Sequence, residues 1–310
     1  MFSVIFPGQG SQSVGMAKEL YDNFAYVKDL FKQADDVLGY SISKIILEGP
    51  KEDLDLTENT QPAIFLVSYS IFEMIKKESN FSLENAKYFA GHSLGEYSAL
   101  ATSGSLDYKN AIKLLNERGR AMQTAVPKGT GGMLAVLGAD IKEINYLLEE
   151  NKNSYKCYIA NDNSNGQIVL SGLNSDIEKF VETLKTKKIK NIKLPVSAPF
   201  HCKLMNKATS IMRDKINNSN FEKPKNVIIS NVTGSETQEI DKIKDLLIKQ
   251  IESPVLWRES VIYMIKKGVT NFIEIGPGKV LSGLVKRIDK TINVNNINKL
   301  EDIKDIKLND

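Results

Sequence analysis

The sequence predicts an α/β fold in which a small unit is inserted into a larger domain built on a parallel sheet. Two stretches of the chain, residues 1–128 and 197–310, alternate strand patterns with helix patterns, which is typical of a parallel sheet. Between them, residues 129–196 place two strands in succession, which breaks that alternation. We therefore expect one discontinuous large α/β domain, 1–128 with 197–310, and one continuous small domain, 129–196.

The first stretch opens with a strand and contains two long helical patterns. Residues 2–6 are apolar except for Ser3 and are followed by Pro7, which ends a strand. Helical periodicity follows over residues 15–38 and 60–78, with Pro62 in the first turn of the second helix, where proline is tolerated. A strand over 87–90, a tight turn over 91–95 and helices over 96–102 and 107–126 complete the stretch.

The middle stretch has the order β-α-β-β-α-β. Its expected strands cover residues 132–137, 155–160, 167–171 and 189–196, and its expected helices cover 140–150 and 175–187. The second and third strands are joined by a polar turn over residues 161–166. This order is the ferredoxin-like pattern.

The last stretch returns to α/β alternation, as an insertion requires. Its expected helices cover 201–216, 240–250, 259–267 and a final segment to 288, and its expected strands cover 227–230 and 271–275. The turn over 276–278, Gly-Pro-Gly, separates the last strand from the last helix.

Composition excludes several classes of protein. The 310 residues include 41 Lys plus Arg and 38 Asp plus Glu. The resulting net charge of +3 is too small to favour binding to nucleic acid or an anionic membrane. Two cysteines without a Cys/His cluster predict neither a disulfide framework nor a metal site. No run approaches the ~20 apolar residues of a membrane helix, and the apolar N-terminus is too short for a signal peptide. We expect a cytoplasmic protein.

A candidate nucleophile lies in the tight turn. Residues 91–95, Gly-His-Ser-Leu-Gly, match the G-x-S-x-G nucleophile elbow, in which a sharp strand-to-helix turn exposes the serine oxygen. A glycine-rich turn without a catalytic role could have the same sequence. The strand pattern before the motif and the helix pattern after it favour the elbow, with Ser93 as nucleophile.

The chain offers two histidines as a base for Ser93. His92 is the immediate neighbour of the serine, and an elbow directs adjacent side chains apart. His201 lies at an expected strand-to-helix transition, where a side chain can face a cleft. An isolated histidine is more often structural, but elimination leaves His201 as the candidate base.

An oxyanion next to Ser93 needs two preorganised donors. The main-chain N–H of Leu94, directly after the nucleophile, is one candidate. The loop over residues 7–12 follows the first strand and can supply a second, from Gln9. The same loop could instead cradle a nucleotide phosphate, but its glycines break the G-x-G-x-x-G spacing.

One arginine lies on the apolar face of its helix. In the helix expected over 107–126, Arg118 shares a stripe with Leu115 and Met122, whereas Arg120 lies off it. A guanidinium on an apolar face needs an anionic partner. That partner is either a structural carboxylate or the carboxylate of a substrate, and the spacing does not decide between them.

Together these segments resemble the malonyl-coenzyme A:acyl carrier protein transacylases of fatty acid synthesis. The matching motifs run in the family's order over residues 6–12 (FPGQGSQ), 91–97 (GHSLGEY), 118–119 (RG) with 122–123 (MQ), 199–202 (PFHC) and 274–279 (EIGPGK). They span residues 6 to 279 of the chain. The resemblance implies a hydrolase-like α/β domain with an inserted ferredoxin-like domain.

The resemblance also implies a role for each motif. Ser93 would take the malonyl group as an ester, with His201 as base and later as acid. The N–H groups of Gln9 and Leu94 would bind the oxyanion, and Arg118 would hold the malonyl carboxylate.

Two further residues are implied by the resemblance alone. The main-chain carbonyl of Gln250 would orient the histidine in place of the usual acidic residue. Phe200 resembles the bulky residue that crowds branched acyl groups in malonyl-selective members.

The implied substrates are malonyl-coenzyme A and the phosphopantetheine thiol of acyl carrier protein, which react in a ping-pong sequence. No cofactor is implied, because the coenzyme A thioester is a substrate, and we expect a monomer.

Three other functions share parts of this pattern. A serine esterase or thioesterase would use the same elbow and base, but Arg118 would have no purpose with a neutral acyl group. A free-standing acyltransferase serving a polyketide synthase would perform the same chemistry on another carrier. A nucleotide-binding protein without catalytic activity is the most distant alternative.

Overall fold

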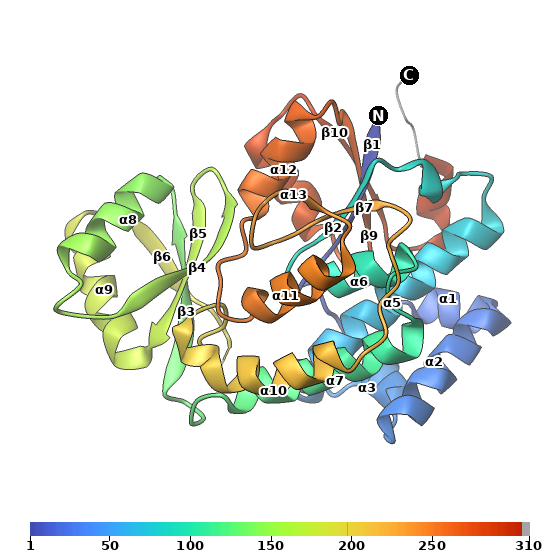
Figure 1. Ribbon diagram of the computed structural model, residues 1–310, viewed down its shortest axis with the longest axis horizontal. Helices are drawn as coiled ribbons and strands as arrows, with labels where there is room; N and C mark the ends of the chain where they lie inside the picture. Colours follow the sequence, from blue (N-terminus) through green and yellow to red (C-terminus); the bar gives the residue numbers. More distant parts are fainter. Residues whose placement is uncertain (197, 306–310) are drawn as a thin grey trace.

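The computed structural model describes residues 1–196 and 198–305, which form two β-sheets and the helices around them (Figure 1). Ser197, with which the second segment of the predicted large domain begins, and residues 306–310 at its end lie outside the described residues. In Figure 1 the smaller sheet and two helices project to the left of the larger body.

The larger sheet is the predicted parallel sheet. Its six strands lie in the order β10-β9-β1-β2-β7-β8, and the first five of these run parallel to their neighbours. Their bounds are β1 Phe2–Phe6, β2 Tyr88–Gly91, β7 Val227–Ile229, β8 Glu236–Thr237, β9 Asn271–Ile275 and β10 Asn293–Ile297. β8 pairs antiparallel at one edge, and neither edge strand was predicted, because β8 has two residues and β10 is rich in asparagine.

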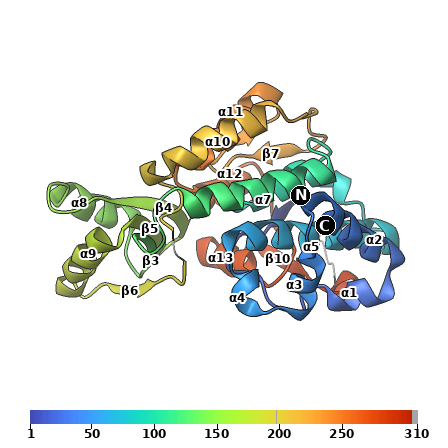
Figure 2. The same cartoon turned by 90° about the horizontal axis from the view of Figure 1, so that it is seen from below.

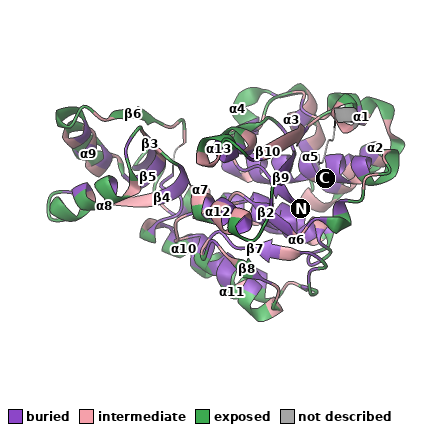
Figure 3. Ribbon diagram, turned by 90° about the horizontal axis from the view of Figure 1, so that it is seen from above, coloured by how far each residue is buried: buried purple, intermediate pink, exposed green. Residues whose placement is uncertain are grey.

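The alternation of side chains along β1 builds a core on each face of this sheet. Val4 and Phe6 point into the larger core, whereas Ile5 points into the other. Helices α12 and α13 cover the face of Ile5, and the remaining large-body helices pack on the opposite face. Because both faces are covered, the central strands are buried at every position, as parallel strands usually are (Figure 3).

The predicted helices of the larger body are present with shifted ends, except that the pattern over 15–38 forms two helices, α1 and α2, and that α3 and α4 were not predicted. Their bounds are α1 Lys18–Asn23, α2 Ala25–Leu38, α3 Ile42–Glu48, α4 Lys51–Leu54, α5 Thr57–Glu78, α6 Gly95–Thr102, α7 Tyr108–Thr124, α10 Asn206–Asn217, α11 Ile240–Gln250, α12 Trp257–Lys266 and α13 Val280–Ile288. Short 3₁₀ turns cover Leu83–Asn85, Lys203–Met205 and Leu300–Asp305. No described helix is long and apolar enough to cross a membrane.

Two of the shifted helix starts change the position of a residue singled out in the sequence, Pro62 in one case and His201 in the other. α5 begins at Thr57, so Pro62 lies in its second turn and cannot bond the carbonyl of Glu58. The side-chain amide of Asn116 donates to that carbonyl instead, at 2.9 Å, which explains why the helix continues through the proline. His201 was expected to open a helix, but α10 starts at Asn206 and the histidine lies in the preceding loop.

The smaller sheet is antiparallel and has the strand order β4-β5-β3-β6. Its elements are β3 Gly131–Leu137, α8 Ile141–Glu150, β4 Cys157–Ser164, β5 Gln167–Leu173, α9 Asn174–Thr186 and β6 Lys190–Lys193. Figure 2 shows α8 and α9 on the side of this sheet away from the larger body. Leu134, Val136 and Leu170 point toward these helices and form a separate core with them.

The predicted turn over residues 161–166 is wrong. β4 continues through Ser164, and only Asn165 and Gly166 lie outside the two strands. The polar residues extend β4 because it pairs with β5 on one side and contacts the larger body on the other. There the amide of Asp162 donates to the carbonyl of Val255 at 3.0 Å, and the amide of Val255 donates to Ala160 at 2.8 Å.

Candidate active site

The turn between β2 and α6 holds Ser93 in the geometry expected of a nucleophile elbow. Ser93 has φ of 55°, a left-handed conformation that costs energy for a residue with a side chain. A Cβ on Gly91 would lie 1.9 Å from the carbonyl oxygen of Gly95, and one on Gly95 would lie 2.4 Å from that of Phe6. Both flanking positions therefore require glycine.

His201 lies against the serine hydroxyl. Its Nε2 is 2.8 Å from Ser93 Oγ, and its Nδ1 is 2.8 Å from the main-chain oxygen of Gln250. A carbonyl oxygen can only accept, so Nδ1 carries the proton and Nε2 accepts from the serine. Burial, reinforced by the charge of Arg118, lowers the pKa of His201 to about 3, so the imidazole is neutral near pH 7. His201 also has a left-handed φ, 58°.

The other histidine points away from the nucleophile. His92 Nε2 lies 2.8 Å from Asn163 Oδ1, and its ring packs against Trp257 with centroids 5.8 Å apart. Burial lowers the pKa of His92. The two histidines thus occupy different sides of Ser93, as the sequence predicts for an elbow.

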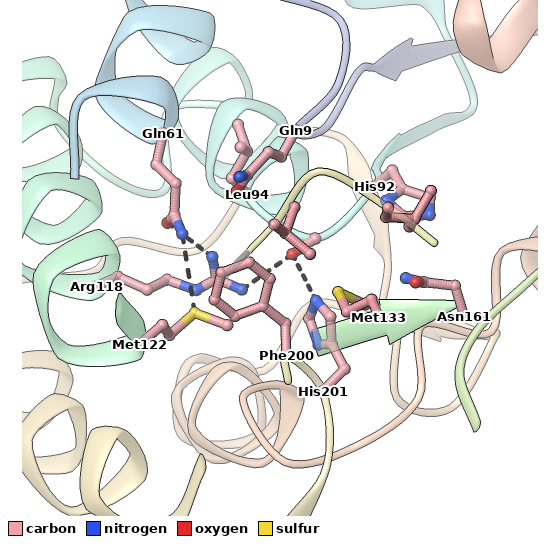
Figure 4. A pocket seen from close by; sticks show the side chains of 13 residues that line it. Gln9, Gln61, His92, Leu94, Arg118, Met122, Met133, Asn161, Phe200 and His201 are labelled. Carbon is pink, nitrogen blue, oxygen red and sulfur yellow. Dashed lines mark hydrogen bonds between the residues drawn. The ribbon is translucent and has the colours of Figure 1, made fainter. Parts of the chain in front are cut away.

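Arg118, from the middle of α7, is fully buried and reaches the serine from the side opposite His92 and Asn161 (Figure 4). Its Nη2 donates to Ser93 Oγ at 3.0 Å and to Gln250 Oε1 at 2.7 Å, and its Nη1 donates to Gln61 Oε1 at 2.7 Å. The Tyr97 ring lies 5.7 Å from the guanidinium carbon. None of the described carboxylates forms an ion pair with it. Arg120 is half exposed and pairs with Glu58 at 3.0 Å.

The main chain around the serine leaves one candidate oxyanion donor. The amide of Ser93 already donates to Asn231 Oδ1 at 2.7 Å, so it is not available to a ligand. Leu94 is the next residue and caps the N-terminus of α6, where N–H groups and the helix dipole favour negative charge.

The predicted second donor, Gln9, lies on the facing loop. This loop is held by Gln12, whose side chain accepts from Gly10 at 2.7 Å and donates to Asp55 at 2.9 Å. Gln9 and Leu94 both line the pocket in front of Ser93.

Six of the seven predicted site residues line one cavity of about 100 Å³ (Figure 4). The lining residues are Gln9, Gln61, His92, Ser93, Leu94, Arg118, Met122, Met133, Asn161, Leu194, Val196, Phe200 and His201. The seventh, Gln250, lies behind this wall, with its main-chain oxygen on His201 and its side chain on Arg118. Since a cavity of ~150 Å³ can bind benzene, this cavity suits a short acyl group.

Sequence reasoning missed three polar residues of the site, one in the cavity wall and two behind it. They are Gln61, Asn231 and Glu96, and all are buried. Asn231 joins the two sides of the elbow, because its side chain accepts from Ser93 and donates to the carbonyl of Gly91 at 2.7 Å. Glu96 Oε2 accepts from Gln250 Nε2 at 2.7 Å and from the amide of Asn231 at 3.1 Å. Gln61 and Asn231 reach the site through contacts across the fold, which leave no local sequence signal, whereas Glu96 lies within the motif over residues 91–97 but its partners do not.

The site contains no cluster suited to a metal. Among residues 1–196 and 198–305, no group of three His, Cys, Asp or Glu side chains comes together.

An α/β chain with a serine on a strand-turn-helix motif and a histidine on its hydroxyl has the arrangement of a serine-nucleophile enzyme. Residues 3–305 match the model of a family described as the acyl transferase domain. The chain is 42% identical over 292 residues to the malonyl CoA-acyl carrier protein transacylase of Bacillus subtilis strain 168, covering 93% of this chain and 90% of that protein. It is 37% identical to the Escherichia coli K12 protein of the same name, covering 96% of each.

Solved structures agree with the sequence relatives. An acyl-carrier-protein S-malonyltransferase from Bartonella henselae superposes with a TM-score of 0.95 at 39% identity, covering 98% of this chain and 97% of that one. A malonyl-transacylase solved in complex with its type II polyketide synthase acyl-carrier protein gives 0.93 at 36% identity, covering 98% and 97%. The chain belongs to the malonyl CoA-acyl carrier protein transacylase family.

Proposed function

We propose that this chain transfers the malonyl group of malonyl-coenzyme A to the phosphopantetheine thiol of an acyl carrier protein through a malonyl-Ser93 ester, and so supplies malonyl units for fatty acid synthesis. The observation that carries the proposal is the position of Arg118. A buried guanidinium without a direct carboxylate partner lies 3.0 Å from the nucleophile, in a cavity of short-acyl size. A free carboxylate on the acyl group would complete this site.

In the first half of the reaction, Ser93 Oγ attacks the thioester carbonyl as His201 Nε2 takes the hydroxyl proton. The neutral imidazole is ready for this step because burial lowers the pKa of His201. The carbonyl of Gln250 accepts from Nδ1 and stabilises the imidazolium that forms. Collapse of the tetrahedral intermediate breaks the C–S bond, and the imidazolium returns the proton to the departing coenzyme A thiolate.

The negative charge of that intermediate lies on the former carbonyl oxygen. The main-chain N–H groups of Leu94 and Gln9 bind it, the first from the positive end of α6 and the second from the facing loop.

In the second half, the carrier's phosphopantetheine thiol enters the place of coenzyme A. His201 takes the thiol proton, the sulfur attacks the ester carbonyl, and Ser93 leaves with the proton from the imidazolium. No cofactor takes part, because the activated acyl group arrives as a thioester.

Two features disfavour a serine esterase or thioesterase. The cavity of about 100 Å³ suits a short acyl group, and a neutral acyl group would leave Arg118 without an anion. Phe200, which is 6% exposed, lines the same cavity and fills space that an α-methyl substituent would need.

A carrier from a polyketide pathway is the second candidate. One of the similar structures is a malonyl-transacylase bound to a type II polyketide synthase carrier, so the same fold serves that type of partner elsewhere. The site chemistry would be identical, and only the carrier would differ.

The proposal includes the division of the chain into two domains and the fold of each. The large domain, 1–128 with 197–310, is a hydrolase-like parallel-sheet domain, and residues 129–196 are an inserted ferredoxin-like domain. The order β4-β5-β3-β6 with antiparallel pairing supports the second part. We place the enzyme in the cytoplasm as a monomer.

A transfer assay tests the function. The purified protein is mixed with malonyl-coenzyme A and either no carrier, a fatty acid synthase holo-carrier or a polyketide holo-carrier. We expect rapid malonylation of the fatty acid carrier and slow loss of thioester without a carrier. Equally fast hydrolysis without any carrier would indicate a thioesterase, and transfer only to the polyketide carrier would indicate the second candidate.

A further inference from the structure

Arg118 is a buried cation held entirely by neutral acceptors. Gln61 Oε1 accepts from Nη1, and Gln250 Oε1 accepts from Nη2, each at 2.7 Å. A guanidinium can only donate, so both amides must present their oxygens to it. The orientation of each glutamine is therefore fixed by the arginine.

The negative charge that compensates Arg118 belongs to Glu96, which is separated from the guanidinium by the side chain of Gln250. Gln250 Nε2 donates to Glu96 Oε2 at 2.7 Å, so its amide bridges the carboxylate and the guanidinium. Glu96 also accepts from the amide of Asn231, and it is 3% exposed. Burial raises the pKa of Glu96 to about 7, and the charge of Arg118 opposes that rise.

This arrangement solves a conflict in the binding of an anionic acyl group. A buried arginine without any counter-ion destabilises the fold, whereas a carboxylate in direct contact neutralises the positive charge that would attract a substrate carboxylate. The Gln250 amide lies between the guanidinium of Arg118 and the carboxylate of Glu96. It keeps the guanidinium oriented, lets the carboxylate offset part of the cost of burying the positive charge, and leaves that charge available to an incoming anion.

We propose that Gln61 and the side chain of Gln250 are specificity-determining spacers, which hold Arg118 through neutral oxygens and keep Glu96, its counter-ion, one amide away. This inference rests on the proposed function, in which Arg118 binds the malonyl carboxylate. For Gln250 the role is separate from that of its main-chain carbonyl, which bonds His201.

The test compares malonyl-coenzyme A with acetyl-coenzyme A at about pH 8, which lies above the pKa of Glu96. Gln61→Glu keeps the shape of the side chain and places a carboxylate directly on the guanidinium. We expect kcat/KM for malonyl to fall at least ~30-fold and to fall further than that for acetyl, so that the malonyl-to-acetyl ratio drops. Gln61→Met removes the acceptor without adding charge, and its loss for malonyl should be smaller, below about tenfold.

Removing the distant charge should act differently. Glu96→Gln retains an acceptor for Gln250 and Asn231 but deletes the counter-ion, so it should lower the melting temperature without lowering the malonyl-to-acetyl ratio. Glu274→Gln is the matched control. Glu274 is a buried carboxylate that accepts from the amides of Leu281 and Ser282 at the start of α13, so its loss should affect stability alone.

The outcomes separate this inference from the proposed function. A ratio unchanged in Gln61→Glu, or a ratio that collapses in Glu96→Gln, overturns the spacer role. If Gln61→Glu does not fold, Gln61→Met and Glu96→Gln test the spacer role instead. A direct role of the Glu96 carboxylate in malonyl binding predicts that the malonyl-to-acetyl ratio collapses in Glu96→Gln. An Arg118→Ala variant that loses malonyl and acetyl transfer equally contradicts the proposed function instead.

Discussion

Replacing Arg118 with alanine removes the charged group beside the nucleophile and leaves Ser93 and His201 in place. Arg118 Nη2 lies 3.0 Å from Ser93 Oγ, so a malonyl ester on that oxygen would bring its carboxylate within reach of the guanidinium. Losing a charge-assisted bidentate contact in a buried site costs about 2–4 kcal/mol, or about 30- to 1000-fold in kcat/KM. Acetyl-coenzyme A has no such carboxylate, so its slow rate should stay the same or rise.

The assay measures both rates for the wild type, Arg118→Ala, Arg118→Lys and Arg120→Ala, after circular dichroism shows that each variant is folded. Lysine should rescue malonyl transfer only in part, because it keeps the charge without the planar pair of donors. Arg120→Ala should be nearly silent, since that side chain is 57% exposed and its ion pair with Glu58 lies on the surface of α5. Equal losses for malonyl and acetyl in Arg118→Ala would refute the reasoning, because the arginine would then be structural.

Three further predictions concern the base and the acyl pocket. His201→Ala should slow acylation by ~10²–10⁴-fold in stopped-flow measurements, whereas His92→Ala should lower thermal stability; a folded but inactive His92→Ala with a fully active His201→Ala would reverse these roles. Because burial lowers the pKa of His201 to about 3, its NMR ring signals should show no titration midpoint between pH 5 and 8, and a midpoint near 6.5 would contradict a buried neutral base. The wild type should prefer malonyl over methylmalonyl, and Phe200→Ser should relax that preference; equal kcat/KM for both acyl groups in the wild type would disprove the steric role.

The sequence carried enough information to predict the parallel sheet and the front of the site. The G-x-S-x-G motif needs only local geometry, and a chain with two histidines leaves few choices of base. Arg118 was identifiable because a charged residue interrupts an apolar stripe, although its partner could not be decided. In the structure, Ser93 Oγ lies within hydrogen-bond distance of both His201 Nε2 and Arg118 Nη2.

The back of the site could not be derived from residue patterns. Gln250 acts on His201 through its main chain, which has no sequence signature, and only the family resemblance pointed to it. Glu96 and Asn231 are 135 residues apart, and their contact exists only after the sheet has formed. The error at residues 161–166 has a related cause, because pairing with β5 and contact with Val255 outweigh the turn preference of a polar segment.

The central claim is that Ser93 carries the malonyl group between the two thiols. Intact-mass analysis after mixing the protein with malonyl-coenzyme A alone should show one added malonyl group, located on Ser93 by peptide mapping and discharged when a holo-carrier is added. Ser93→Ala should show no addition. A malonyl adduct that persists in Ser93→Ala or maps to another residue, or carrier malonylation that proceeds without Ser93, would contradict the account.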